Sequence, residues 1–350
     1  MNEVPIHKKS PMNKPVFFIV ALAVAASILA PANVFSAIAD PSHFAYTVSV
    51  GEATITGYTG PGGDITIPDT LGGHPVVCID FYAFAENSSI TRVTLPADLV
   101  TIFEGAFFSC TRLASIDFPA DLLLIGEGAF SQCTNLVGVA LPTNLTFIGS
   151  AAFANCGRFA SLSLPASLDY IGSSAFTGCN NLTSIAIPSG LTTIESYVFE
   201  NCTRLAKVEI PASISRIDYN AFAGCSNLTR MYFAGSPPSL IWYGFAASRA
   251  TIYYLPSHAD RWPSTYDGRP TLCWNPVVGN MTAPSSTTPF SFPITGTPSI
   301  PVAVEACANL SAGTWDRLLA TNLPPAGVLE FTDTPDSSSH SSRFYRVVAP

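Results

Sequence analysis

The sequence predicts a mainly β fold, in which a solenoid of stacked coils is followed by a small C-terminal β-sandwich-like domain. The first observation is a fixed period, because proline, isoleucine, phenylalanine and cysteine each recur every 23 residues between residues 90 and 227. The second is that each unit opens with alternating apolar and polar residues, which is typical of a short half-buried strand. A repeat of this length indicates a solenoid whose units pack on their neighbours.

The repeated cysteines mark the units most clearly: Cys110, Cys133, Cys156, Cys179, Cys202 and Cys225. In the unit that runs from Leu182 to Arg204, Pro188 ends the first strand because proline has no N–H for a ladder. The apolar positions of this unit do not fit a helical stripe, but all of them can face the inside of one flattened coil: Leu182, Ile185, Ile187, Leu191, Ile194, Phe199 and Cys202. Coils stacked about 4.8 Å apart would pair the strands into a parallel ladder.

The phrases "LTSIAIPSGLTTIESYVFENCTRL" and "LVGVALPTNLTFIGSAAFANCGRF" resemble the BspA-like class of bacterial leucine-rich repeats, and the resemblance covers about residues 44–275. It implies a leucine-rich-repeat solenoid with a parallel sheet on its concave side and short helical or 3₁₀ turns opposite. It also implies exported or surface proteins that bind other macromolecules.

Residues 1–39 have the pattern of a secretory signal peptide. Lys8, Lys9 and Lys14 precede the apolar run Val16–Ala30, and Ala37-Ile38-Ala39 suits cleavage before Asp40. The alternative is an uncleaved membrane anchor, for which a run of 15 residues is short of the ~20 that a spanning helix needs.

Residues 40–78 are expected to form an N-terminal cap and a degenerate first repeat, with a hairpin around Gly51-Glu52 and a bulge at Gly72-Gly73. A cap is needed because an open solenoid end exposes core and a strand edge. We assign residues 79–275 to the repeat solenoid with an aromatic C-terminal cap. Residues 276–289 are assigned to a linker, and residues 290–350, with five short apolar runs, to the sandwich-like domain.

The sequence gives little indication of catalysis, so we expect a protein that is not an enzyme and holds neither a cofactor nor a metal ion. No P-loop, H-E-x-x-H or G-x-S-x-G motif occurs, and the histidines lack ligand-spaced partners. Glu195 and Asp218 recur one coil apart and could in principle act as a glycosidase pair, but solvated surface charge is the simpler interpretation. The six repeated cysteines are expected to be buried free thiols, because stacked Cβ atoms would remain too far apart for an unstrained disulfide.

The outward positions of the first strands form the candidate binding face. Its middle units carry small neutral residues, whereas its ends carry charge, which suits a broad and shallow contact. The candidate binding residues on this concave face are Arg92, Asp117, Lys207, Glu209, Arg230 and Tyr232. An alternative is an aromatic patch near the end of the array, where rings could stack on sugar or simply cover the core: Trp242, Tyr254 and Trp262.

These observations predict an exported binding protein, secreted or held at the bacterial cell surface, that docks a macromolecular partner on the solenoid. A protein partner is preferred. The alternatives are carbohydrate binding through the aromatics of residues 242–274, and a structural envelope protein with no specific ligand. The net charge of −8 and the lack of a basic run argue against nucleic acid. After signal cleavage we expect no membrane span.

Overall fold

The computed structural model describes residues 38–240, 244–245, 248–281, 289–307, 314–333 and 344–349. From Ser36 onward the chain forms one compact unit. The predicted signal peptide and Trp242 lie outside the described residues, apart from Ile38 and Ala39. Within the described ranges, no helix has the length and apolar character to cross a membrane.

The N-terminal cap contains the predicted hairpin. After the 3₁₀ turn η1 (Pro41–His43), strands β1 (Phe44–Ser49) and β2 (Glu52–Tyr58) pair antiparallel, with Ser49 opposite Glu52. Val50 and Gly51 connect them at φ values of 53° and 82°, the left-handed conformation that a two-residue hairpin turn requires. The extra residues around Gly72-Gly73 form a second small hairpin, because β4 (Thr70–Leu71) pairs antiparallel with the start of β5 (His74–Ile79).

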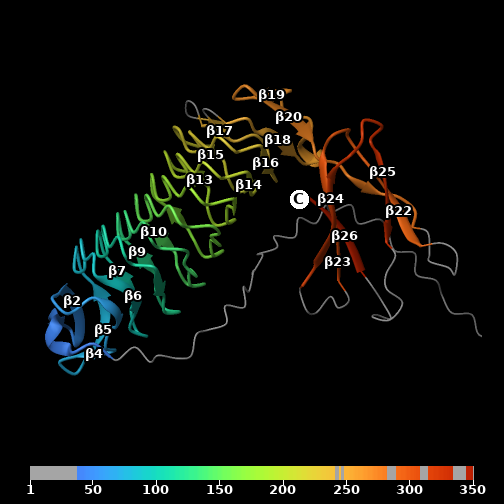
Figure 1. Cartoon of the computed structure of the whole chain (residues 1–350). Helices are drawn as coiled ribbons and strands as arrows, with labels where there is room; N and C mark the ends of the chain where they lie inside the picture. Colours follow the sequence, from blue (N-terminus) through green and yellow to red (C-terminus); the bar gives the residue numbers. More distant parts are fainter. Residues whose placement is uncertain are drawn as a thin grey trace, which may run out of the picture. The chain divides into compact units, whose positions relative to one another are not determined.

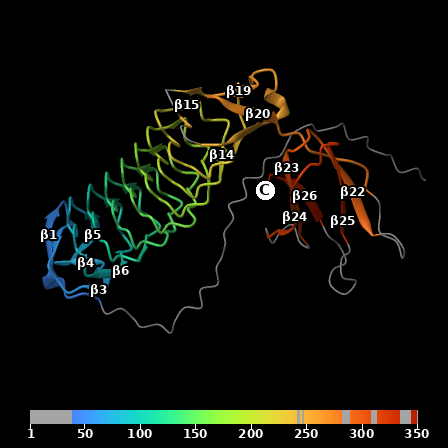
Figure 2. The same cartoon turned by 45° about the horizontal axis from the view of Figure 1, so that its top comes forward.

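Two parallel ladders run along the array, and Figures 1 and 2 show its coils stacked side by side. The first-strand ladder contains β3 (Gly63–Thr66), β6 (Ile90–Thr94), β8 (Ser115–Asp117), β12 (Ser184–Ala186), β14 (Lys207–Ile210), β16 (Arg230–Phe233), β18 (Thr251–Tyr254) and β20 (Arg269–Cys273), with β19 (Thr265–Tyr266) as a hairpin partner of β20. The second-strand ladder contains β5, β7 (Thr101–Ile102), β9 (Leu124–Ile125), β10 (Phe147–Ile148), β11 (Tyr170–Ile171), β13 (Thr193–Ile194), β15 (Arg216–Ile217) and β17 (Ser239–Leu240). The register follows the 23-residue period, since Ser184 pairs with Lys207 and Ile148 with Ile171. The predicted parallel solenoid is therefore confirmed.

The ladders are not continuous, which differs from the expectation of a strand in every coil. The first-strand ladder ends at β8 and resumes at β12, so residues 138–140 and 161–163 pair in no strand. Gly138 contributes to this gap because a glycine inside a strand lacks a side chain to pack and is entropically costly. The second-strand ladder is interrupted between β11 and β13.

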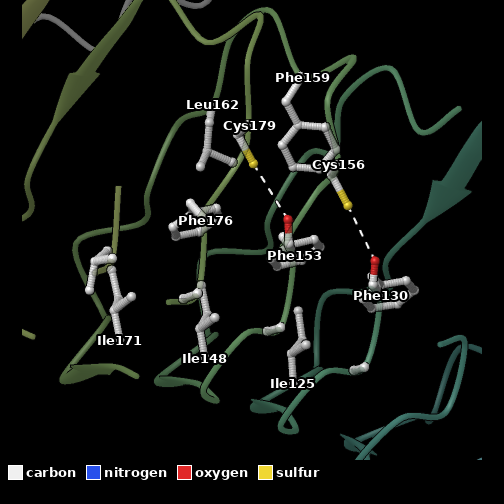
Figure 3. Close-up of a cluster of buried hydrophobic side chains, with 14 of the residues drawn as sticks. Ile125, Phe130, Ile148, Phe153, Cys156, Phe159, Leu162, Ile171, Phe176 and Cys179 are labelled. Atoms are coloured by element: carbon white, nitrogen blue, oxygen red, sulfur yellow. Dashed lines mark hydrogen bonds between the residues drawn. The ribbon is translucent and has the colours of Figure 1, made fainter. Parts of the chain in front are cut away.

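Stacked phenylalanines fill the core along the array. Successive rings lie nearly parallel, with centroids 5.2 Å apart between Phe107 and Phe130 and 5.6 Å apart between Phe153 and Phe176. Figure 3 shows the rings of Phe130, Phe153 and Phe176 above the aligned isoleucines Ile125, Ile148 and Ile171. The inward orientation predicted for these positions is confirmed, because all of the repeated phenylalanines are buried.

The return arcs are hydrogen-bonded turns. In one arc the N–H of Phe107 donates to the Ala129 carbonyl of the next coil, and the N–H of Ser109 donates to that of Ser131. Two residues per arc adopt positive φ, such as Gly105 and Ser109 at 60° and 56°. The helical residues of the described chain are confined to η1 and η2 (Pro256–His258), outside the regular arcs.

The C-terminal strands form the two packed sheets expected for a sandwich. One sheet has the order β21 (Val277–Val278), β22 (Phe290–Thr295), β25 (Val328–Asp333), and the other has the order β24 (Asp316–Asn322), β23 (Pro301–Cys307), β26 (Phe344–Val348). All their pairings are antiparallel. Side chains from both sheets, including Phe292 and Val304, share one apolar core. Because β21 pairs with β22, the start of the predicted linker belongs to this sheet.

Candidate functional site

The N-terminal end of the first-strand face carries an exposed ion pair. Arg92 on β6 and Asp117 on β8 approach to 3.6 Å between Nη1 and Oδ2. Their side chains are 49% and 67% exposed, so the pair contributes little to stability. Both groups are accessible to a partner.

The C-terminal end of this face carries a denser cluster on two paired strands. Lys207 lies opposite Arg230, and Glu209 lies opposite Tyr232, in the register of β14 and β16. Lys207 Nζ is 3.0 Å from Glu209 Oε1 and 5.7 Å from the centroid of the Tyr232 ring. The structure thus places the four predicted residues of this end beside one another, although their binding role stays a prediction.

Tyr232 is not an exposed anchor, and that part of the prediction is wrong. Its side chain is 2% exposed and stacks on Tyr253, with ring centroids 5.1 Å apart. Both tyrosines belong to the apolar core formed by the C-terminal sheets, together with Phe292 and Ile300. Burial raises the pKa of the Tyr232 hydroxyl above its usual range. Alternation along the strand gave the correct side of the sheet, but the C-terminal domain covers that side.

Small neutral residues occupy the face between these two charged ends. The middle coils present Gly138, Ala140, Ser161, Ser163, Ser184 and Ala186. Except for Gly138, which is partly covered, these residues are exposed. The coils that present the first four of them are also the ones that lack first-strand pairing.

The alternative aromatic patch is mostly covered. Trp262 is 7% exposed, and its Nε1–H donates to the Gly235 carbonyl at 3.1 Å. Tyr254 stacks on Trp262 with centroids 5.5 Å apart and is half-buried. An open platform for sugar stacking at these two residues is therefore contradicted, since the rings cover the end of the repeat core. The third member, Trp242, lies outside the described residues.

Two charged residues that the sequence analysis missed complete this end of the array. The Asp267 carboxylate accepts the N–H of Phe245 at 3.1 Å, where a next-coil carbonyl serves in earlier arcs. Arg269 Nη2 donates to the Phe245 carbonyl at 3.0 Å. The sequence feature that could have indicated them is Asp267-Gly268, a turn-forming dipeptide that lies one repeat length after Phe245.

Glu195 and Asp218 have an arginine beside them, which favours a structural role. Arg216 Nε lies 2.9 Å from Asp218 Oδ1, in ion-pair contact but outside hydrogen-bond geometry, and Arg216 Nη2 lies 3.9 Å from Glu195 Oε1. Burial and the neighbouring Asp218 raise the pKa of Glu195, while Arg216 opposes them. The pairing of β13 with β15 brings the two carboxylates together, and Arg216 contacts both of them.

All nine cysteines are free thiols, as predicted for the six of the repeat. Each repeat thiol donates to a phenylalanine carbonyl, as Cys156 does to Phe130 at 3.2 Å and Cys179 to Phe153 at 3.4 Å (Figure 3). Burial raises the pKa of Cys110 and Cys225 to about 12. These thiols are therefore protonated core residues.

In the C-terminal domain, Glu305 forms a buried charge cluster that the sequence analysis did not single out. Its carboxylate accepts from Arg317 Nη2 at 2.8 Å and from Arg346 Nη2 at 2.7 Å. The Arg346 guanidinium lies over the Trp315 ring, 4.2 Å from its centroid. Hydrogen bonds from the arginines hold the pKa of Glu305 below its usual value, although burial, the largest single influence, acts in the opposite direction.

Comparison with known proteins identifies the repeat. A family model described as a BspA type leucine-rich repeat region matches six copies at residues 63–162 and 146–264. The leucine-rich repeat protein TpLRR of T. pallidum is 32% identical over 55% of this chain and 90% of its own, with a TM-score of 0.52. A leucine-rich repeat protein from Bacteroides ovatus is 24% identical over 63% of this chain and 62% of its own, with a TM-score of 0.54, and supports the fold alone. No curated protein matches. The chain belongs to the BspA-type leucine-rich repeat family.

Proposed function

We propose that the protein binds a macromolecular partner, preferably a protein, on the first-strand face of its solenoid. The observation that carries this proposal is the cluster of Lys207, Glu209 and Arg230 beside a neutral, exposed middle. Family membership supports binding in general, because BspA-type repeat proteins bind other macromolecules and are typically not enzymes. A rigid ladder loses little conformational entropy when a partner docks.

We also propose that the protein is exported to the bacterial surface or secreted. The support is the signal-peptide pattern of residues 1–39. Protein recovered from the native host should begin at Asp40. A surface-bound protein that still begins at Met1 would contradict signal cleavage.

The docking proposal is tested with Lys207→Ala and Arg230→Ala, singly and together. If both side chains anchor the partner, cross-linking to surface proteins of the native host should weaken by about 5–30-fold for each substitution. Both side chains are partly exposed and neither belongs to an apolar core, so we expect melting temperatures close to the parent.

Arg261→Ala is the matched control, because this exposed arginine lies in the C-terminal cap, off the first-strand face. A double variant that melts like the parent and captures its partner in full would reject the docking proposal. If the parent protein itself captures no partner from the native host, the structural envelope role is favoured instead.

A further inference from the structure

A row of arginines runs along the joint between the return arcs and the first strands. Arg112, Arg158 and Arg204 occupy the same repeat position at every second coil, 46 residues apart. Asn135 and Asn181 hold that position in the coils between them. All three arginine side chains are exposed. We call these three residues the arginine row.

The stacking of the coils sets the spacing of the row. Phenylalanine rings one coil apart have centroid distances of 5.2 and 5.3 Å between Phe107, Phe130 and Phe153. Residues two coils apart are therefore separated by on the order of 10 Å. Side chains on adjacent rungs touch, because Arg204 Nη1 donates to Asn181 Oδ1 at 3.0 Å. The row thus presents guanidinium groups at a regular interval with amides between them.

Charge is segregated around the array. Seven of its eight cations between residues 90 and 250 lie at the arc-to-strand joint or on the first strands: Arg92, Arg112, Arg158, Arg204, Lys207, Arg230 and Arg249. Only two of the ten carboxylates in this range, Asp117 and Glu209, lie there. Within residues 38–240 no carboxylate forms an ion pair with the arginine row. Among the described residues of this range, the arginine row is therefore a line of cations without ion-pair partners on an acidic protein.

We propose that the arginine row binds a linear acidic polysaccharide laid across the coils. Guanidinium groups bind carboxylate or sulfate oxygens through paired N–H donors, and the intervening asparagines can hydrogen-bond sugar hydroxyls. The spacing suits a polymer whose acidic groups are separated by neutral sugars. It is a poor match to nucleic acid, in which one strand places a phosphate about every 3.4 Å along the helix axis.

This inference does not rest on the proposed protein docking, because the arginine row shares no residue with Lys207, Glu209 and Arg230. Neither does it use the aromatic residues at the end of the array. Each proposal can therefore fail while the other stands.

The test measures binding of the chain that begins at Asp40 to four immobilised polymers. Hyaluronan supplies carboxylates, heparin supplies sulfates, dextran is neutral, and single-stranded DNA is the competing polyanion. We expect binding to at least one of the two acidic polysaccharides and none to dextran. Each of Arg112→Gln, Arg158→Gln and Arg204→Gln should weaken it about threefold, as for an exposed ion pair. The triple variant should lose at least about tenfold, with a shallower salt dependence.

Two controls separate the row from general charge. Arg261→Gln removes an exposed arginine away from the row and should leave binding unchanged. The pair Asp121→Asn and Asp169→Asn raises the net charge of the protein without altering the arginine row. The proposal is overturned if neither acidic polysaccharide binds the parent protein, if DNA binds as well as they do, or if Arg261→Gln weakens binding as much as a row substitution. Full binding by any row variant that melts like the parent would also overturn it.

Discussion

At the scale of single residues, the phenylalanine at the centre of each coil carries the largest packing contribution. Phe176 is fully buried, with its ring centroid 5.6 Å from that of Phe153 and 5.7 Å from that of Phe199. Phe176→Ala should destabilise the protein by about 3–5 kcal/mol, because neighbouring coils cannot collapse into the space that it leaves. Denaturant unfolding of the variant measures this loss. An exposed substitution, Ser161→Ala, is the control, and an equal midpoint for the two variants would contradict the packing role.

The repeat cysteines give a second residue-scale prediction. Unreduced protein, once denatured, should take up one alkyl group on each of its nine cysteines, since all are free. Burial raises the folded-state pKa of Cys110 from 9.0 to about 12, so the unfolded chain releases this proton first as pH rises. The thiol contribution to stability is therefore complete below about pH 9 and is lost as pH rises from 9 towards 12. Mass spectrometry checks the first statement and unfolding at pH 8 and pH 10.5 the second. Any linkage of Cys110 to Cys133 would refute the free-thiol assignment.

The sequence predicted which repeat residues point inward because the 23-residue period samples the same position many times. It could not predict the environment of Tyr232, since alternation shows from which side of a strand a side chain leaves and not what lies over that side. The cover comes from residues of the C-terminal sheets such as Phe292, Ile300 and Phe331, which are remote in sequence and belong to no repeat. Nor does the period show the thiol-to-carbonyl hydrogen bond of Cys156, because that contact depends on the left-handed turns of the arc.

At the scale of the coil, glycines set how closely successive turns approach. A Cβ added at Gly149 would lie 2.5 Å from the Glu127 nitrogen, which is backbone of the preceding coil and cannot move aside locally. Gly149→Ala should therefore cost about 1–3 kcal/mol through overpacking. Gly138→Ala is a matched control, because its nearest atom would be the Ser161 carbonyl oxygen at 3.8 Å. Thermal melting of both variants makes the comparison, and equal melting temperatures would exclude close approach as the role of Gly149.

The strands themselves were predictable where proline follows alternating aliphatic residues, as in β12 and β14. The gaps in the ladders were not predictable, because the same sequence motifs occur in coils that pair and in coils that do not. Residues 161–163 read Ser-Leu-Ser, as good an alternation as Ser184–Ala186, yet only the latter forms a strand. Pairing depends on the neighbouring coil as well, and the neighbour of residues 161–163 contains Gly138.

At the scale of the whole molecule, the array is held together by three parallel sets of contacts, of which both ladders are open at the step from β11 to β13 and only the return arcs continue. The first-strand ladder is open between β8 and β12, whereas the second-strand ladder is open between β11 and β13. The return arcs continue across both gaps, since Ser174 donates to Ser196 at 2.9 Å and Phe176 to Val198 at 2.9 Å. Because neighbouring coils are the unit of stability in a solenoid, the β11–β13 step should divide the array into two blocks that open separately.

A change of residue at one repeat position coincides with that step. Three successive coils have glycine at this repeat position, namely Gly126, Gly149 and Gly172. The next coil has Glu195 there. A Cβ at Gly172 would lie 2.4 Å from the Ser150 nitrogen, and we infer that the Glu195 side chain hinders the same approach. A side chain at this position does not prevent pairing in every coil, because the N–H groups of Phe103 and Asp218 still donate to Ile79 and Ile194. The opening at the step is lined by apolar side chains that include Ile171, Leu191 and Ile194.

Glu195→Gly should therefore let the two blocks close into one ladder. We expect slower hydrogen exchange of the amides at positions 193–195 and a single, sharper unfolding transition, because each coil would then pair with both neighbours. Asp218→Gly is the control, since the Asp218 N–H already donates to the Ile194 carbonyl at 2.8 Å and has no ladder bond to gain. Exchange at 193–195 that is as fast in Glu195→Gly as in the parent would show that the side chain is not what separates the blocks. The interruption would then have to originate elsewhere, such as in the geometry of the return arc that follows. In that arc the Ser174 N–H donates to the Ser196 carbonyl of the next coil.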